Sequence, residues 1–193
     1  MFPFRFPLNG RHFAIIDGCS GFGLSLASLI RSCGGYVSLL GSDEDHLHEA
    51  ACTLHGARIV LRRGDPLRDL TGLLQGAAPV DQLIMPAAVS GTCQTANGTT
   101  SFDLGPCRIS DLVQRALSLT SAQCQITLLG PEDAVLEDDL LKLLAEHAGD
   151  SPLLMFDSNE MPAVASAVLN QLLSRRVRLQ FLRGRMRLEE SQE

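Results

Sequence analysis

Residues 12–35, HFAIIDGCSGFGLSLASLIRSCGG, decide the fold, because they join an apolar run to an amphipathic run through a glycine-rich turn. Residues 12–17 are apolar, with aromatic and β-branched members, which is typical of a buried strand. Residues 24–33 repeat apolar side chains at helical spacing and stop at a Gly-Gly pair, a favourable helix end. The turn at residues 17–23 would therefore present backbone amides and the positive end of a helix dipole to an anion.

The order of strand and then helix recurs along the chain. Further strands are predicted at residues 36–40, 58–61, 82–85, 125–129, 153–156 and 177–182. One further helix is capped by Ser42 or Asp43 and ends at Gly56, and others are predicted at residues 66–74, 109–119, 132–147 and 162–173. Residues 90–105, rich in Gly, Thr and Ser, are expected to form a loop. The pattern predicts an α/β fold: a doubly wound, Rossmann-type parallel sheet of about six strands with helices on both faces.

The last predicted strand differs from the others. Along residues 177–182 the apolar positions alternate with Arg178 and Gln180, and such alternation predicts one wet face or an edge position. Six arginines lie between residues 175 and 187, and seven acids lie between residues 132 and 150. These charges predict either two solvated faces or a basic patch for a protein partner, for which Arg178 and Arg185 are the candidates.

The overall composition excludes several classes of protein. With 193 residues, 45% hydrophobic, we expect a single domain over residues 1–193, with residues 185–193 as a disordered tail. A net charge of -6 argues against a broad nucleic-acid surface. No apolar run reaches the roughly 18 residues of a membrane span, and the opening MFPFRFPLNG lacks the apolar core of a secretion signal. Six scattered cysteines without a C-x-x-C pair indicate reduced thiols, so we expect a cytoplasmic protein.

Several segments resemble the short-chain dehydrogenases/reductases. LNGRHFAIIDGCSGFGLSLASLI (residues 8–30) resembles the opening of that family, and YVSLLGSDEDHLHEAACTL resembles its second strand, turn and helix. DQLIMPAAVS (residues 81–90) resembles the segment that lines the cofactor, and residues 164–184 resemble the family's long helix and following strand. The resemblance implies binding of NAD or NADP by a set of residues in these segments: Gly18, Ser20, Gly21, Phe22, Gly23, Ser42, Asp65, Pro86, Ala87 and Ala88.

The chain departs from the family's pattern within this set. The glycine turn is one residue shorter than T-G-x-x-x-G-x-G, and Asp17 replaces its Thr. An acid there would repel a phosphate unless it points into the turn and caps it. Pro86, Ala87 and Ala88 stand where the family has Asn-Asn-Ala, and Ser42 stands where NADP-preferring members often carry Arg. NAD, NADP or no cofactor thus remain open alternatives.

The family's catalytic set is missing. Its chemistry uses a Tyr as general acid, a Lys four residues later that lowers the pKa of that Tyr, and a Ser that polarises the carbonyl. This chain has one Tyr, Tyr36, and one Lys, Lys142, in unrelated segments, and no Ser near Gly130. It also lacks most of the substrate-covering segment and final strand of longer members. The resemblance therefore implies a truncated and divergent member without the family's usual mechanism.

Other residues are weak candidates for chemistry. Asp157 or Glu160 could act as acid or base in the cleft, but the same spacing is that of a helix-capping box. Cys19, in the glycine turn, is either a thiolate favoured by the helix dipole or a small buried filler. Four residues whose side chains could bind a metal share one stripe of the predicted helix: Glu44, His48, Cys52 and His55. The stripe flanks the apolar face of that helix on the side of solvent, so no metal is expected there.

Three hypotheses for function follow. The first is a catalytically degenerate protein that binds, senses or assembles, with weak dinucleotide binding and a homodimer or another protein as partner. The second is an atypical NAD(P)-dependent oxidoreductase that uses a different proton donor. The third is a non-redox enzyme, a lyase, isomerase or dehydratase, that has recycled the cleft.

Overall fold

The computed structural model describes residues 8–19, 21–55, 59–64, 66–75, 79–86, 89–95, 98–104, 106–131, 136, 138–147, 161–174 and 178–184. The strands are β1 (His12–Ile16), β2 (Tyr36–Gly41), β3 (Ile59–Arg63), β4 (Gln82–Pro86), β5 (Val89–Thr95), β6 (Gly98–Leu104), β7 (Gln125–Pro131) and β8 (Leu179–Gly184). The helices are α1 (Gly21–Ser32), α2 (Glu44–Leu54), α3 (Pro66–Gln75), α4 (Pro106–Leu119), α5 (Asp138–His147) and α6 (Met161–Ser174).

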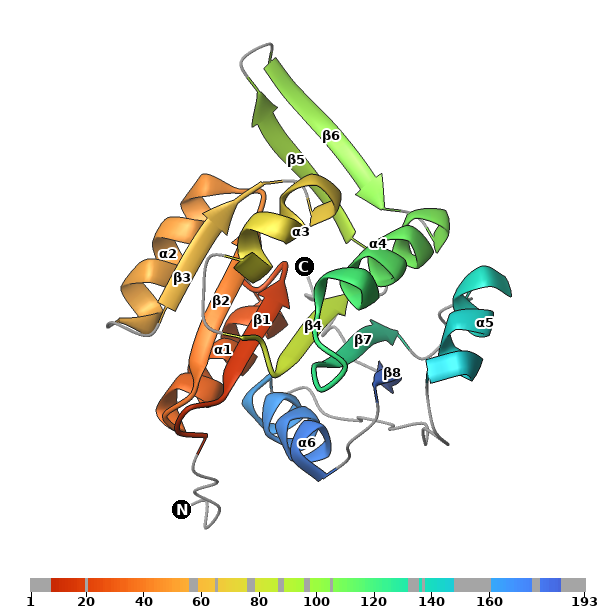
Figure 1. Ribbon diagram of the computed structural model, residues 1–193. Coiled ribbons are helices and arrows are strands. Elements are labelled where there is room, and N and C mark those ends of the chain that lie inside the picture. Colours follow the sequence, from red (N-terminus) through yellow and green to blue (C-terminus); the bar gives the residue numbers. More distant parts are fainter. Residues whose placement is uncertain are drawn as a thin grey trace, which may run out of the picture.

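The main sheet has six strands in the order β3-β2-β1-β4-β7-β8, and every neighbouring pair in it is parallel. Helices lie on both faces (Figure 1), which confirms the predicted doubly wound α/β fold. The strand order turns outward in both directions from the β1–β4 pair. Ligands of open α/β sheets bind at the carboxyl ends of the strands at such a switch point, so this pair fixes where a site is expected.

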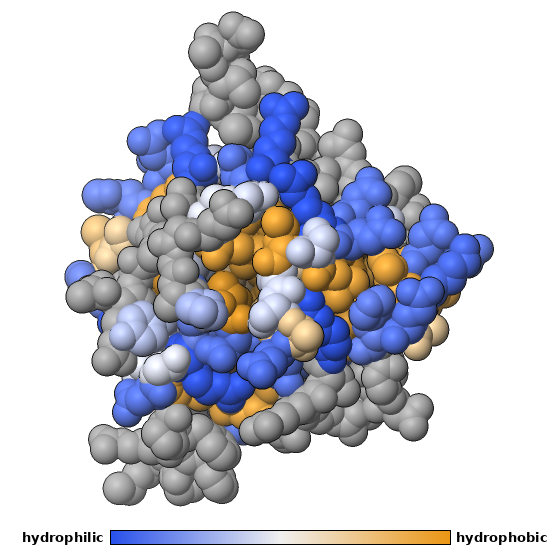
Figure 2. Space-filling model, in the orientation of Figure 1, coloured by the Kyte–Doolittle hydropathy of each residue, from blue (hydrophilic) through white to orange (hydrophobic). Residues whose placement is uncertain are grey.

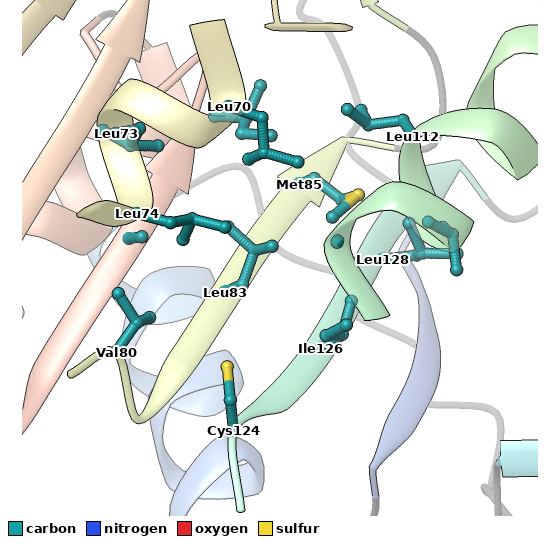
Figure 3. Packing of buried hydrophobic residues seen from close by; sticks show 14 of the residues in the cluster. Leu70, Leu73, Leu74, Val80, Leu83, Met85, Leu112, Cys124, Ile126 and Leu128 are labelled. Carbon is teal, nitrogen blue, oxygen red and sulfur yellow. The ribbon is translucent and has the colours of Figure 1, made fainter. Parts of the chain in front are cut away.

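Two apolar cores sandwich the sheet. Leu70, Leu112 and Leu140 bring α3, α4 and α5 onto one face, and part of this core is shown in Figure 3. Leu26, Ala50 and Val168 bring α1, α2 and α6 onto the other face. Successive residues of each strand point to opposite faces, so one strand serves both cores: β1 gives Ala14 and Ile16 to the first and Phe13 and Ile15 to the second.

The link from β7 to β8 visits both faces. It contains α5, which packs in the first core, and then α6, which packs beside α1 in the second. The acidic helix expected from residue 132 begins in the structure at Asp138. The expected strand at residues 153–156 and the expected tail at residues 185–193 lie outside the described residues. Among the described helices, none is both long and apolar enough to cross a membrane.

The expectation of a loop at residues 90–105 is wrong. β5 and β6 form a separate antiparallel sheet of two strands, which projects from the body in Figure 1. The register pairs Thr95 with Gly98, so only two residues connect the strands. Asn97-Gly98, where the connection meets β6, is a turn signal in the sequence, and threonine favours strands, so the composition that suggested a loop also fits a hairpin.

The interpretation of β8 is half right. It lies at the edge of the main sheet, as its alternation predicted. The alternative of a wet face is wrong, because Gln180 is only 1% exposed and donates a hydrogen bond from Nε2 to Thr127 Oγ1 at 2.8 Å. Arg178 is also used inside the chain: its guanidinium donates to the Leu117 and Thr120 carbonyls at 3.1 and 3.3 Å, and to the Cys124 carbonyl. It therefore caps the carboxyl end of α4.

Candidate functional site

The glycine turn lies at the switch point. It leaves β1 at Ile16 and enters α1 at Gly21. The Asp17 amide donates to the Leu40 carbonyl at 2.8 Å, which ties the start of the turn to β2. Asp17 and Gly21 have φ values of 57° and 49°, so the turn uses two left-handed residues to reverse the chain. Asp is one of the few side chains that tolerate this region, which gives Asp17 a backbone role that Thr would not fill as well.

Two glycines make the turn tight and a third leaves it open. A Cβ on Gly18 would lie 2.9 Å from atoms of Ile15 and Leu39, and one on Gly23 would lie 2.7 Å from the Asp17 carbonyl oxygen. These two positions therefore require glycine. Nothing lies within 4 Å of a Cβ built on Gly21, which is exposed at the first turn of α1. The backbone there is accessible to an anion at the positive end of the helix dipole.

Cys19 is a filler and not a nucleophile. It is 2% exposed, and its Sγ lies 2.8 Å from the place that a Cβ on Gly41 would take, at the end of β2. Burial and, second, the Asp17 carboxylate raise the pKa of the thiol to about 12. The dipole of α1 does not overcome these effects, so the thiolate alternative is wrong.

Several charged side chains lie near the glycine turn, at the start of α2 and the end of β3. Asp17 is exposed, yet neighbouring protein atoms raise the pKa of its carboxyl by partial desolvation, and His46 opposes this in part. The expected cap of α2 is confirmed as Asp43, which accepts from the His46 amide at 2.9 Å. That hydrogen bond is the main reason why the pKa of Asp43 is lowered. Glu44 pairs with Arg63 of β3 at 2.6 Å. Among the described side chains at this place, the three acids Asp17, Asp43 and Glu44 outnumber the one arginine.

The structure describes only some of the other residues that were predicted to bind the cofactor or to act as an acid. Phe22 and Gly23 are half-buried at the start of α1, Ser42 is half-buried directly after β2, and Pro86 ends β4 in register with Leu129. Four further cofactor candidates and both acid candidates lie outside the described residues: Ser20, Asp65, Ala87, Ala88, Asp157 and Glu160. The structure therefore brings together the turn, the end of β2 and the end of β4 at the carboxyl ends of the parallel strands.

The side chains of Tyr36 and Lys142 do not lie together. Tyr36 begins β2, at the opposite end of the sheet from the glycine turn. Six residues of strand separate these ends, which corresponds to roughly 17 Å. Lys142 lies on α5, where it is exposed and donates to Asp139 Oδ1 at 2.9 Å. The two side chains are thus on different elements and neither is at the turn.

A serine–histidine pair is buried elsewhere in the sheet. His12 Nε2 lies 2.8 Å from Ser38 Oγ, and Asp81 Oδ2 accepts from the His12 amide at 2.7 Å. The three residue types suggest a hydrolytic triad, but Asp81 contacts the backbone of His12 there and Ser38 is fully buried. A nucleophile needs access to its substrate, so this pair is structural.

The histidine and cysteine stripe on α2 does not converge on a metal. Glu44 is engaged by Arg63, and His48 Nε2 lies 3.9 Å from Cys52 Sγ on an exposed surface. Within the described ranges, no group of three His, Cys, Asp or Glu side chains could hold an ion. The cysteines described as free are Cys19, Cys33, Cys52 and Cys124.

Comparison with known proteins identifies the fold. No protein-family profile and no curated protein sequence matches the chain. A metagenomic short-chain oxidoreductase in complex with NADP superposes with a TM-score of 0.63 at 15% identity, covering 95% of this chain and 100% of that one. A short-chain dehydrogenase from Bacillus anthracis gives 0.64 at 12% identity, covering 93% and 96%. The short-chain dehydrogenase/reductase described as a glucose/ribitol dehydrogenase from Brucella melitensis gives 0.63 at 15%, covering 94% and 97%. The chain therefore has the fold of the short-chain dehydrogenases/reductases.

Proposed function

We propose that this chain is a binding protein on a dehydrogenase fold, which holds a dinucleotide weakly at the glycine turn and acts in sensing or assembly. The observation that carries the proposal is the separation of Tyr36 from Lys142, with neither beside the turn. Protonation of a nascent alkoxide needs an acid whose pKa a neighbouring cation has lowered, and this chain has only one Tyr and one Lys to provide the pair.

Support for dinucleotide binding comes from the turn itself. Gly21 is open at the switch point, and Gly18 and Gly23 allow the close turn that brings amides of α1 toward a phosphate. One structure of the same fold contains NADP. Asp17 and Asp43 both carry carboxylates on the side where β1 and β2 end, so we propose NADH as a better ligand than NADPH, which adds a phosphate.

The test is calorimetric titration of the chain with NADH and NADPH, with Asp17→Asn as the variant. Asn tolerates the left-handed backbone at this position, so the turn is kept while one negative charge is lost. We expect Asp17→Asn to tighten NADH binding about three- to tenfold at low salt, since one charge near a phosphate is worth about 1 kcal/mol. Asp111→Asn, exposed on α4, is the matched control and should not change the affinity.

The pH dependence provides a second readout. Because the pKa of Asp17 is raised, its carboxyl takes up a proton at a higher pH than an ordinary aspartate. NADH binding by the natural chain should therefore tighten as the pH falls through that pKa, and Asp17→Asn should lose this dependence. An absence of binding in both chains would reject the dinucleotide. Steady oxidation of NADH with a carbonyl substrate would instead establish the atypical oxidoreductase.

A further inference from the structure

Arg63 ends β3 at the carboxyl ends of the parallel strands, where the glycine turn also lies. Its partner in the parallel register is Gly41, the last residue of β2, and the Gly64 amide donates to the Gly41 carbonyl at 3.1 Å. β2 in turn pairs with β1, which leads into the glycine turn. Three neighbouring strands thus bring Arg63 and the turn to one end of the sheet (Figure 1).

The guanidinium of Arg63 is held by an acid of α2. Nη1 of Arg63 donates to Glu44 Oε2 at 2.6 Å, which joins the end of β3 to the first turn of α2. Asp43, the cap of α2, is also within electrostatic reach. The pKa of Asp43 is lowered mainly by the hydrogen bond from the His46 amide and more weakly by the charge of Arg63. Arg63 is therefore a cation close to two acids that follow β2.

An exposed ion pair is not in itself a sign of function. Figure 2 shows hydrophilic side chains over much of the described surface on one side of the molecule, and surface ion pairs usually contribute little to stability. The side chain of Glu44 is 77% exposed and that of Arg63 is 33% exposed, so the pair can open at little cost and a ligand can reach the guanidinium. What distinguishes this pair is its place directly after β2.

The segment after β2 is where the sugar of a dinucleotide lies in Rossmann folds. The pyrophosphate lies at the start of the first helix, an acid about 20 residues farther along binds the ribose 2′-hydroxyl, and a nearby arginine instead accommodates a 2′-phosphate. Asp43 stands at that spacing from the glycine turn. Ser42 carries no charge, so the arginine described beside this segment is Arg63 of β3. Both kinds of group are present, and Glu44 occupies the arginine.

We propose that Glu44 determines the choice between NADH and NADPH, by holding the guanidinium that would otherwise bind the 2′-phosphate. This role of Glu44 rests on the proposed function, because it needs the nucleotide at the glycine turn. For NADPH to bind, its 2′-phosphate has to displace the Glu44 carboxylate and to approach the Asp43 carboxylate, which repels it. For NADH, the ribose hydroxyl donates to Asp43 and leaves the ion pair intact. The natural chain therefore selects the nucleotide without the additional phosphate.

Calorimetric titration with NADH and NADPH at low salt tests this role. The readout is the ratio of the two dissociation constants, NADPH over NADH, because a change that acts on the shared part of the two nucleotides cancels in it. We expect the ratio to be above one for the natural chain. It should fall about tenfold in Glu44→Gln, since a freed guanidinium gains charged hydrogen bonds to the phosphate.

Asp45→Asn is the matched control for Glu44→Gln. It removes the same charge from the first turn of α2 without releasing Arg63, which pairs with Glu44. It should change the ratio less than about threefold, as expected for an exposed charge that makes no direct contact with the phosphate.

A double variant separates the freed guanidinium from the loss of negative charge. Glu44→Gln combined with Arg63→Gln should return the ratio to at least its natural value, because no cation is then freed for the phosphate. Circular dichroism should show that all variants fold, as the exposure of these side chains favours.

The outcomes separate the role of Glu44 from the proposed function. Binding of NADH with an unchanged ratio in Glu44→Gln would overturn the role of Glu44 and leave the proposed function standing. Equal falls in the ratio for Glu44→Gln and Asp45→Asn, or a fall that persists in the double variant, would also overturn it. Failure of every chain to bind either nucleotide would reject both.

Discussion

At the scale of single residues, the glycine turn combines an exposed acid with a buried thiol. Asp17 faces solvent and uses its tolerance of a left-handed backbone, while Cys19 fills the space beside Gly41. Two residues separated only by Gly18 thus differ in their exposure to water, because the turn reverses the chain between them. Their side chains set both the charge of the site and its inertness to thiol reagents.

Cys19 should resist alkylation that Cys52 undergoes readily. Cys19 is 2% exposed with a pKa raised to about 12, so almost no accessible thiolate exists at neutral pH, whereas Cys52 is exposed on α2. Brief treatment with iodoacetamide followed by peptide mass spectrometry should label Cys52 and leave Cys19 unmodified until denaturant is added. Equal labelling rates would contradict the buried position. Because its folded pKa is raised, Cys19 should begin to reduce stability only as the pH rises above about 9.

The buried pair of Gln180 and Thr127 offers a second test at this scale. Gln180 Nε2 donates to Thr127 Oγ1, and Gln180 Oε1 has no partner within the described part of the chain. Thr127→Val should cost about 1–3 kcal/mol of unfolding free energy, because the whole amide would then be buried unpaired. Adding Gln180→Leu should restore most of that loss. Urea titration measures both, and a double variant less stable than Thr127→Val would refute the explanation.

At the scale of elements, the sequence predicted the inner strands of the main sheet well, because both faces of these strands are apolar. Other features were predicted from local turn and cap residues. The glycine turn, the alternation of strand and helix, and a cap at Ser42 or Asp43 follow from local chemistry, and the structure has the turn, the alternation and the cap at Asp43. The hairpin was missed because Thr, Ser and Gly suit both loops and strands, and only Asn97-Gly98 marks the turn. For Gln180 and Arg178 the sequence left a wet face, an edge position or a partner surface open, because alternation cannot show that a polar side chain has a partner on another element.

The contacts of the Arg178 guanidinium lead to a second point at this scale. Its guanidinium contacts the carbonyls of Leu117 and Thr120 and the Thr120 hydroxyl, at 3.1, 3.3 and 2.9 Å, which joins β8 to the end of α4. Arg178→Ala should lower the free energy of unfolding by about 2 kcal/mol without changing the mass in sedimentation, since charged hydrogen bonds to those carbonyls are lost. Arg115→Ala, exposed on α4 with one bond to Thr71, is the control and should cost less. If Arg178→Ala changed the mass in sedimentation and left the free energy of unfolding unchanged, Arg178 would belong to a surface that binds a partner.

At the scale of the whole molecule, the two cores share their strands. Phe13 and Ile15 belong to one core and Ala14 and Ile16 to the other, so neither face can lose its helices without exposing strands that the other face needs. The same sharing occurs in β2, where Leu39 and Leu40 serve opposite faces. The α5–α6 link, which crosses from one face to the other, adds a covalent connection between the layers. Such a sandwich should unfold as one cooperative unit.

Tyr36 makes that cooperativity measurable. The chain has no Trp and one Tyr, so its fluorescence reports on the start of β2 alone, while far-ultraviolet circular dichroism reports mainly on the helices of both layers. In urea the two signals should follow one transition with the same midpoint and slope, because loss of either helical layer removes the support of β2. Replacement of residues 89–104 by a short linker should leave that shared midpoint in place, since the hairpin lies in a sheet separate from the six-stranded one. A helical signal that falls before the Tyr36 signal would mean that one layer detaches alone, and the chain would then consist of more than one folding unit.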